Sequence, residues 1–225
     1  MKIITSPQKY DGFIAQYQLD KILHSETLNS ARLVKIQASE YLTLQNSKAS
    51  YLYFLVDGRL QIERYELNGN KVIFSFENTF SVIGDLELFN DPDKENLIHS
   101  TIQALSDCYL LALPLSSIQQ NELNSPIFLQ FICQQLSKKL YHASQLHSNS
   151  SYDVEYKLRR YLAFTYNQYG SDFKLENRES IAAMLGVSVR QLNRTLSKLA
   201  QENLIRYKGK HVIIINADDL LNYDQ

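Results

Sequence analysis

The sequence has few cysteines, few glycines and prolines, and no tryptophan. Only Cys108 and Cys133 occur among 225 residues, and both stand among apolar neighbours. A structural disulfide would be unusual in a chain that we expect to be cytosolic, so we interpret both as buried free thiols. There is no CxxC motif, and the five histidines are scattered. These patterns predict neither a metal site nor a cofactor.

Long apolar runs are missing as well. No stretch approaches the roughly 20 residues that a membrane-spanning helix needs, and the N-terminal MKIITSPQKYDGF lacks the core of a signal peptide. We therefore expect a cytoplasmic protein with no membrane partner. The sequence also lacks a Gly-rich phosphate loop, a nucleophile elbow and an HExxH helix, and Asp85 and Glu87 have no partner for acid–base chemistry. An enzyme is not favoured.

The near-neutral total conceals an uneven distribution of charge. The whole chain has a formal charge of −1, but residues 152–215 carry +5, whereas residues 1–151 and 216–225 carry −3 each. A basic segment joined to an acidic one is typical of a nucleic-acid-binding domain carried by a second domain.

The most informative stretch is 179–199, ESIAAMLGVSVRQLNRTLSKL. Apolar residues recur at helical spacing on both sides of Gly186, which predicts two short helices joined by a glycine turn. Asn177 and Ser188 stand where the helices would begin, as N-caps. The second helix turns leucines inward, and its opposite face is polar without a carboxylate. The inward residues are Leu192, Leu196 and Leu199, and the outward ones are Arg190, Asn193, Arg194 and Ser197.

Arginine, asparagine and serine suit the base edges and phosphates of double-stranded DNA. Two helices around a short glycine turn are typical of a helix-turn-helix. An ordinary pair of packed surface helices is the alternative for this stretch alone. The following QENLIRYKGKHVIIIN, however, predicts a β-hairpin with strands at 204–207 and 212–215 and with Lys208 and Lys210 at its tip. The combination favours a DNA-binding winged helix.

The N-terminal half has a different sequence pattern. Residues 10–30 predict a helical lead-in, and residues 31–113 form short strand-like runs separated by turn residues, which predicts a β-sandwich or barrel. Asp57-Gly58 and Asn68-Gly69 are interpreted as hairpin turns.

Residues 126–148 predict one long helix, because Pro126 suits its first turn and no further proline or glycine follows. Its apolar stripe has two interpretations: packing on the chain's own barrel, or the seam of a two-helix homodimer. We favour the homodimer, since a helix-turn-helix usually meets a two-fold-symmetric operator. The predicted interface residues are Phe128, Ile132, Leu136, Leu140 and Ala143.

The polar stretch SNSSYD at 148–153 is interpreted as a linker, followed by a helix at 154–169. We therefore divide this α+β chain into a barrel domain with flanking short helices (1–125), a long helix with its linker (126–149) and a winged helix-turn-helix domain (150–225).

This order of parts resembles the cyclic-AMP receptor / fumarate-nitrate regulator (Crp/Fnr) family of bacterial transcription regulators. The most specific pieces are YFLVDGRLQI (53–62), GDLELF (84–89) and LAQENLI (199–205). The resemblance implies a cyclic-nucleotide-binding-like jelly roll and a homodimeric regulator of transcription. RNA polymerase and an unidentified small-molecule effector are further candidate partners. The alternatives are a ligand-independent regulator whose barrel is only a dimerisation scaffold, and a ligand-binding regulatory protein of the cyclic-nucleotide type.

In cyclic-nucleotide-binding members, a segment like 84–89 supplies an acidic residue for the ribose, and a following arginine neutralises the phosphate. Here Asp85 stands where glutamate is usual, and Ile98 and His99 stand at the place of the arginine. A buried phosphate would lack its guanidinium, so cyclic AMP is not expected. The cysteines of iron–sulfur members are absent too. The resemblance places the effector pocket at Gly84, Asp85, Leu86, Glu87, Ile98 and His99.

For DNA, the resemblance assigns base contacts to the start of the second helix. Arg194 matches the family's guanine-reading arginine, whereas Arg190 stands where glutamate is common, so we expect a different operator. The predicted DNA-binding residues are Arg178, Ser188, Val189, Arg190, Gln191, Asn193, Arg194, Ser197, Lys208 and Lys210.

Overall fold

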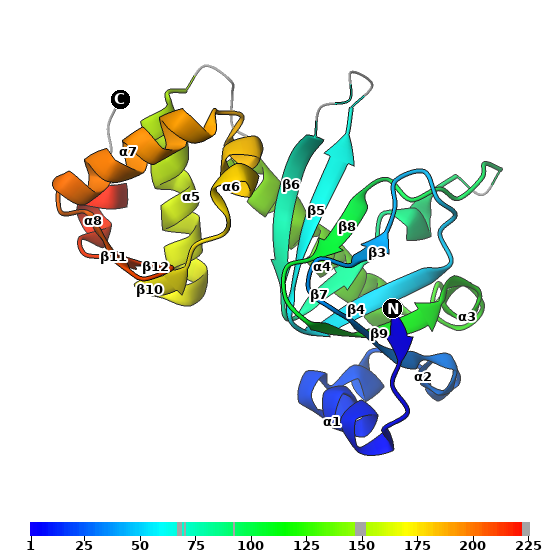
Figure 1. Ribbon diagram of the computed structural model, residues 1–225. Helices are drawn as coiled ribbons and strands as arrows, with labels where there is room; N and C mark the ends of the chain where they lie inside the picture. Colours follow the sequence, from blue (N-terminus) through cyan, green and yellow to red (C-terminus); the bar gives the residue numbers. More distant parts are fainter. Residues whose placement is uncertain (67–68, 70, 92, 147–151, 222–225) are drawn as a thin grey trace. The chain divides into compact units, whose positions relative to one another are not determined.

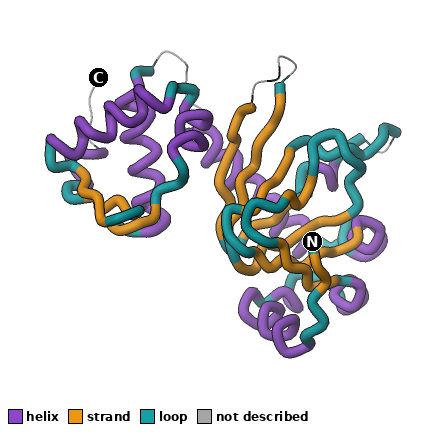
Figure 2. Tube along the Cα trace, in the orientation of Figure 1, coloured by secondary structure: helices purple, strands orange, loops and turns teal. Residues whose placement is uncertain are grey.

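The computed structural model describes residues 1–225 except 67–68, 70, 92, 147–151 and 222–225. The chain forms two compact units, Met1–Lys139 and Leu140–Gln225, and each is described by itself. Strands predominate in the first unit and helices in the second (Figure 2). Among the described residues, no helix combines the length and apolar character that crossing a membrane requires. Most of the predicted linker at 148–153 lies outside the described residues.

The first unit begins with a two-residue strand and short helices, continues mainly as strands and ends in two further helices (Figure 1). Its elements are β1 (Lys2–Ile3), α1 (Pro7–Tyr17), the 3₁₀ helix η1 (Leu19–Lys21), α2 (Ser25–Ser30), β2 (Arg32–Ile36), β3 (Tyr41–Thr43), β4 (Tyr51–Asp57), β5 (Arg59–Tyr65), β6 (Lys71–Asn78), β7 (Ser81–Ile83), the 3₁₀ helix η2 (Glu87–Phe89), β8 (Thr101–Ala104), β9 (Cys108–Pro114), α3 (Leu115–Asn121) and α4 (Pro126–Leu146), whose last residues belong to the second unit.

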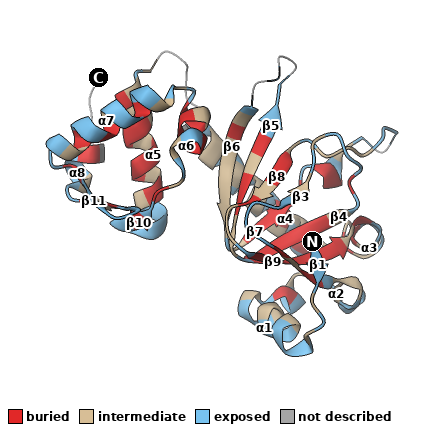
Figure 3. Ribbon diagram, viewed as in Figure 1, coloured by how far each residue is buried: buried red, intermediate tan, exposed pale blue. Residues whose placement is uncertain are grey.

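The strands form two antiparallel sheets, with the orders β1-β2-β9-β4-β7 and β3-β8-β5-β6. This is the predicted jelly roll. Strand β4, which lies between β9 and β7, is apolar on both faces. Phe54 packs in a cluster with helix residues, whereas Leu55 packs in the cluster between the sheets. Figure 3 shows this burial along β4 and β9. A strand covered on both sides needs no apolar–polar alternation, which explains the run YLYFLV.

The turn at Asp57-Gly58 is not a hairpin, which corrects the sequence-based prediction. β4 pairs with β7 and β9, whereas β5 pairs with β6 and β8, so the chain passes here from one sheet to the other. Gly58 has φ +99°, and a Cβ there would lie 2.5 Å from the carbonyl oxygen of Asp107. The glycine is therefore required by a close crossing of backbones. The second predicted hairpin is confirmed by the pairing of β5 with β6, although Asn68 lies outside the described residues.

Helix α4 packs its first half on the barrel. Phe128 and Ile132 are fully buried with β4 and α3 residues, and Leu136 packs against the same cluster. Phe128 and Ile132 were predicted at a dimer seam; within the chain they are core residues, because apolar spacing alone does not tell an internal neighbour from a partner. Leu140 is 73% exposed. Cys133, predicted to be buried, is exposed, whereas Cys108 is buried.

The second unit is a winged helix-turn-helix. A three-stranded sheet of order β10-β12-β11 joins the predicted hairpin to an additional strand, and Phe173 of that strand pairs with Val212. Beyond the end of α4, its elements are α5 (Val154–Tyr169), β10 (Asp172–Lys174), α6 (Arg178–Leu185), α7 (Val189–Gln201), β11 (Ile205–Lys208), β12 (His211–Ile214) and α8 (Ala217–Leu221).

Candidate nucleic-acid interface and effector pocket

Helix α6 begins and ends, and helix α7 begins, at the residues that the sequence indicates. The side chain of Asn177 accepts a hydrogen bond from the Ser180 amide, and Gly186 ends α6 with φ +64°. Ser188 and Gln191 form a reciprocal capping box at the start of α7. Each local signal satisfies backbone groups that a helix end leaves without partners. The start of α7 is therefore fixed by the chain itself.

The outward face of α7 is polar and open. Leu192, Leu196 and Leu199 are buried, and the predicted base-reading residues lie on the other side. Val189 is half-buried, and the exposed ones are Arg190, Gln191, Asn193, Arg194 and Ser197. The hydroxyl of Ser188 and the amide oxygen of Gln191 serve the capping box. Arg190, Asn193 and Arg194 are thus the residues best placed to meet base edges.

The wing places positive charge at its tip. Lys208 and Lys210 flank Gly209, and both are exposed. Arg178 is half-buried, with its guanidinium 5.6 Å from the centre of the Tyr207 ring, and its Nη1 makes no hydrogen bond to any part of the chain that the structure describes. Arg206, also exposed on β11, is a further cation that sequence reasoning did not single out. We expect the exposed cations among these groups to contact phosphate beside α7.

An ion-pair network beneath α7 ties it to α5. Glu155 accepts hydrogen bonds from Arg159 Nε and Nη2 at 3.0 and 2.8 Å and also pairs with Lys198 of α7. Glu202 accepts from Arg159 as well, at 3.3 Å. Burial raises the pKa of Glu155, but the hydrogen bonds from Lys198 and Arg159 outweigh it and hold the pKa below its ordinary value. The ionised carboxylate therefore stabilises the unit.

This network predicts a stability that depends on pH. Because the folded-state pKa of Glu155 is lowered, its contribution is complete above the ordinary pKa of about 4.5 and is lost as the pH falls through the folded value. We expect Glu155→Gln to lower the free energy of unfolding by about 1–2 kcal/mol at pH 7. Urea unfolding at pH 7 and at lower pH should show the difference between the two proteins shrinking below about pH 4.5. A difference that stays constant with pH would contradict this role.

The barrel segment predicted to bind an effector is held by internal contacts. Asp85 is buried, and Lys139 Nζ of α4 lies 2.9 and 3.0 Å from its two carboxylate oxygens while also donating to the Val82 carbonyl. Glu87 is buried and accepts from the His99 amide at 2.8 Å. Gly84 has φ +93°, and a Cβ there would lie 2.9 Å from the Tyr51 carbonyl oxygen. Both carboxylates thus have partners within the chain.

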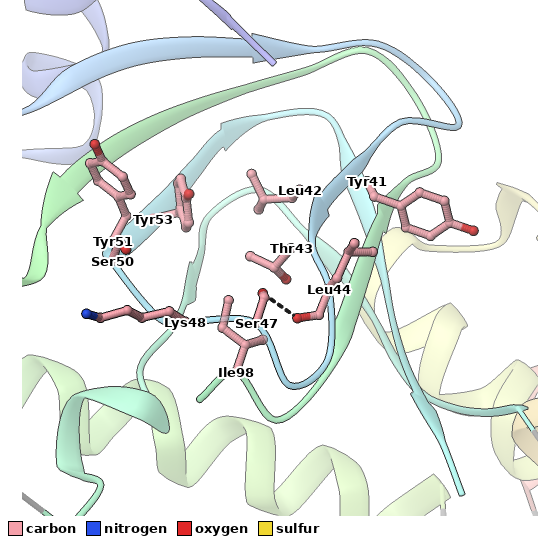
Figure 4. A pocket seen from close by; sticks show the side chains of 10 residues that line it. All are labelled: Tyr41, Leu42, Thr43, Leu44, Ser47, Lys48, Ser50, Tyr51, Tyr53 and Ile98. Carbon is pink, nitrogen blue, oxygen red and sulfur yellow. Dashed lines mark hydrogen bonds between the residues drawn. The ribbon is translucent and has the colours of Figure 1, made fainter. Parts of the chain in front are cut away.

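A cavity of about 400 Å³ opens beside this segment, between β3, β4 and the loop that joins them (Figure 4). Of the six residues predicted for the effector pocket, Ile98 lines this cavity. Leu86 is exposed. His99 is also exposed, and its Nε2 lies within hydrogen-bonding distance of Asn90 Oδ1. The lining comprises Tyr41, Leu42, Thr43, Leu44, Ser47, Lys48, Ser50, Tyr51, Tyr53 and Ile98.

Three tyrosines and one lysine in this lining were missed from the sequence. Tyr51 and Tyr53 alternate along β4, with their rings 5.8 Å apart, and Lys48 precedes them. Burial, with Tyr51 nearby, raises the pKa of Tyr53 to about 12, so its hydroxyl stays neutral. Two tyrosines at alternate positions of an otherwise apolar strand were the sequence signal that could have indicated this cavity. The cavity can offer rings, hydroxyls and one ammonium group to a ligand.

Comparison with known domain families assigns a family to each unit. A model described as a cyclic nucleotide-binding domain matches residues 33–121, and one described as a Crp-like helix-turn-helix domain matches residues 157–223. The first match covers the jelly roll, and the second covers α6, α7 and the wing.

Individual relatives cover most of the chain. Regulatory protein YeiL of Escherichia coli O157:H7 is 30% identical over 190 residues, which are 84% of each chain. The cAMP-activated global transcriptional regulator CRP of Haemophilus influenzae is 23% identical over 84% of this chain and 87% of that protein. FixK2 of Bradyrhizobium japonicum shares the fold with a TM-score of 0.73 at 17% identity, over 87% of this chain and 98% of its own. The c-di-GMP-responsive regulator CLP of Xanthomonas campestris gives 0.72 at 19%, over 92% and 99%.

Proposed function

The chain belongs to the Crp/Fnr family of transcription regulators, and from this premise we propose that it binds a pseudo-palindromic operator as a homodimer, under the control of its barrel. The observation that carries the proposal is the exposed, carboxylate-free face of α7, with Arg190, Asn193 and Arg194 on a helix whose start is capped. Two such helices in successive major grooves would lie about 34 Å apart.

The first test is selection of bound sequences from a random DNA pool with ligand-free protein, followed by fluorescence anisotropy on the selected sequence. A palindromic motif that is bound tightly without additive supports a dimeric regulator whose resting state is competent for DNA. Weak binding that is blind to sequence and steeply sensitive to salt would mean that an effector is required.

Arg194→Ala is expected to weaken binding to the selected operator by about 1–3 kcal/mol and to relax one base position. The loss follows from removing a guanidinium that can bond a guanine edge in two places. Anisotropy titrations on the operator and on single-base variants measure both effects. Wild-type affinity in this variant would show that α7 is not the reading helix in the way proposed.

Lys208→Ala serves as the matched control. A lysine at the wing tip contacts phosphate, so its removal should weaken binding to all sequences alike and reduce the slope of log affinity against log salt by about one unit. The two variants together separate base reading from phosphate contact. An unchanged base preference is expected in Lys208→Ala.

The homodimer is supported by the outward face of α4. Leu140, one of the residues predicted at the interface, is 73% exposed and so is available to a second copy of the helix. Leu140→Glu should therefore convert the dimer to monomer in analytical ultracentrifugation and weaken operator binding, because two half-sites no longer act together. Ile3→Glu, at an exposed isoleucine of β1, is the control and should remain dimeric. If Leu140→Glu stayed dimeric, the proposal that α4 forms the dimer interface would be wrong.

The effector site that we propose is the tyrosine-lined cavity of the barrel. Cyclic AMP is not the expected ligand, since Asp85 is already paired with Lys139 and no arginine follows the segment. The cavity favours a ligand with a flat apolar part and hydrogen-bonding groups at its edge. Tight DNA binding by ligand-free protein would instead favour the barrel as a dimerisation scaffold.

A further inference from the structure

A second cavity, of about 420 Å³, lies within the second unit. The last residues of α4 form one wall with Tyr141 and His142, and the middle of α5 forms another with Arg160 and Phe164. None of these residues belongs to the exposed face of α7 or to the barrel cavity. The space is comparable with the smaller ligand pockets of proteins.

One part of this cavity is built of rings. The His142 ring packs edge-on against the ring of Phe164, with centroids 4.7 Å apart and planes at 75°. Tyr141 is 62% exposed, although tyrosine is a large aromatic residue. Side chains of this kind offer a flat ligand both faces and edges to pack on.

The other part is lined by arginine. Two guanidinium groups line the cavity, and no aspartate or glutamate is present in its lining among the described residues. Arg159 is held by Glu155, Glu202 and the carbonyl of Asp219. Arg160 lies at the cavity with its guanidinium 5.6 Å from the centre of the Tyr156 ring. A planar guanidinium in this position suits a carboxylate or phosphate.

We propose that this cavity is a ligand site for a small organic anion that carries a flat apolar ring. The ring packs against Phe164 and Tyr141, the anionic group meets Arg160, and the amide of Gln168 lies at the rim. A ligand so placed contacts α4 and α5 at once. The site is separate from the proposed effector cavity, and it does not depend on the function proposed for that cavity.

The test uses full-length protein and 4-fluorobenzoate as the probe, followed by fluorine NMR line width. Its uncharged analogue, 4-fluorobenzyl alcohol, is the control ligand. For a probe of this size we expect a dissociation constant of about 1 mM. We expect Arg160→Gln to weaken binding about tenfold. Lys157→Gln removes a positive charge from α5 outside the lining and should leave binding unchanged.

A second variant tests the same site without changing Arg160 itself. Gln168 is exposed, so Gln168→Glu adds a carboxylate at the rim and should weaken binding of the anion by repulsion, whereas Gln201→Glu at the end of α7 should not. Three results would each overturn the site. The first is that the uncharged analogue binds as tightly as 4-fluorobenzoate, and the second is that the variants and their controls lose the same affinity. The third is that 4-fluorobenzoate does not bind at concentrations several times the expected dissociation constant. DNA affinity, measured without the probe, tests the proposed function independently.

Discussion

Lys139→Met is expected to lower the free energy of unfolding of the first unit by about 2–4 kcal/mol. The substitution keeps the length of the side chain but leaves the Asp85 carboxylate buried without its ammonium partner, and it removes the hydrogen bond to the Val82 carbonyl. A lone buried charge costs far more than the pair contributes. Urea unfolding at pH 7, followed by fluorescence and circular dichroism, measures the loss.

Two variants control this prediction. Lys138→Met changes the neighbouring lysine, which is exposed, and should cost less than about 0.5 kcal/mol. The double variant Asp85→Leu with Lys139→Met replaces the pair by apolar side chains and should recover most of the stability. A double variant as unstable as the sum of the two single ones would show that the residues do not interact.

Gly58→Ala is expected to lower the free energy of unfolding of the first unit by about 3 kcal/mol. A Cβ at this position meets the Asp107 carbonyl oxygen at 2.5 Å and the Cys108 sulfur at 2.6 Å, and φ of +99° is unfavourable for alanine. The crossing of the chain between the two sheets has to open to accept the methyl group. Thermal and urea unfolding of the purified variant measure the loss.

Gly69→Ala isolates the backbone contribution. Gly69 has φ +81°, but nothing lies within 4 Å of a Cβ there. The free energy of unfolding of this variant should therefore fall only by the energy of the positive φ, about 1 kcal/mol. If both alanine variants lost the same free energy of unfolding, the close contact at Gly58 would not contribute to the loss.

The second unit could be predicted almost residue by residue, because its signals are local. Asn177, Gly186 and Ser188 each act within one turn of helix, and the leucine spacing identifies the buried face of α7. The jelly roll could be predicted as a class from its short strands. The proposed contacts of Arg194 and of the wing lysines with DNA stay predictions, since they depend on a partner.

Long-range neighbours could not be derived from the sequence. The Asp-Gly pair at 57–58 is the same signal whether the next strand pairs with its predecessor or crosses to another sheet. Lys139 and Asp85 are 54 residues apart, so no spacing rule joins them. The stripe of Phe128 and Ile132 has the same period whether it meets the chain's own β4 or another subunit. Cys133 has apolar neighbours in sequence, but it lies on the outward side of α4.

The capping box at Ser188 and Gln191 has a consequence for how this protein can acquire new target genes. The side chains that start α7 bond to one another, and its leucines hold it in place, whereas Arg190, Asn193 and Arg194 take no part in either task. Substitutions at those three positions should therefore leave folding nearly unchanged. Under the base-reading role proposed for these residues, retargeting to another operator would proceed by single steps, none of which passes through an unstable intermediate.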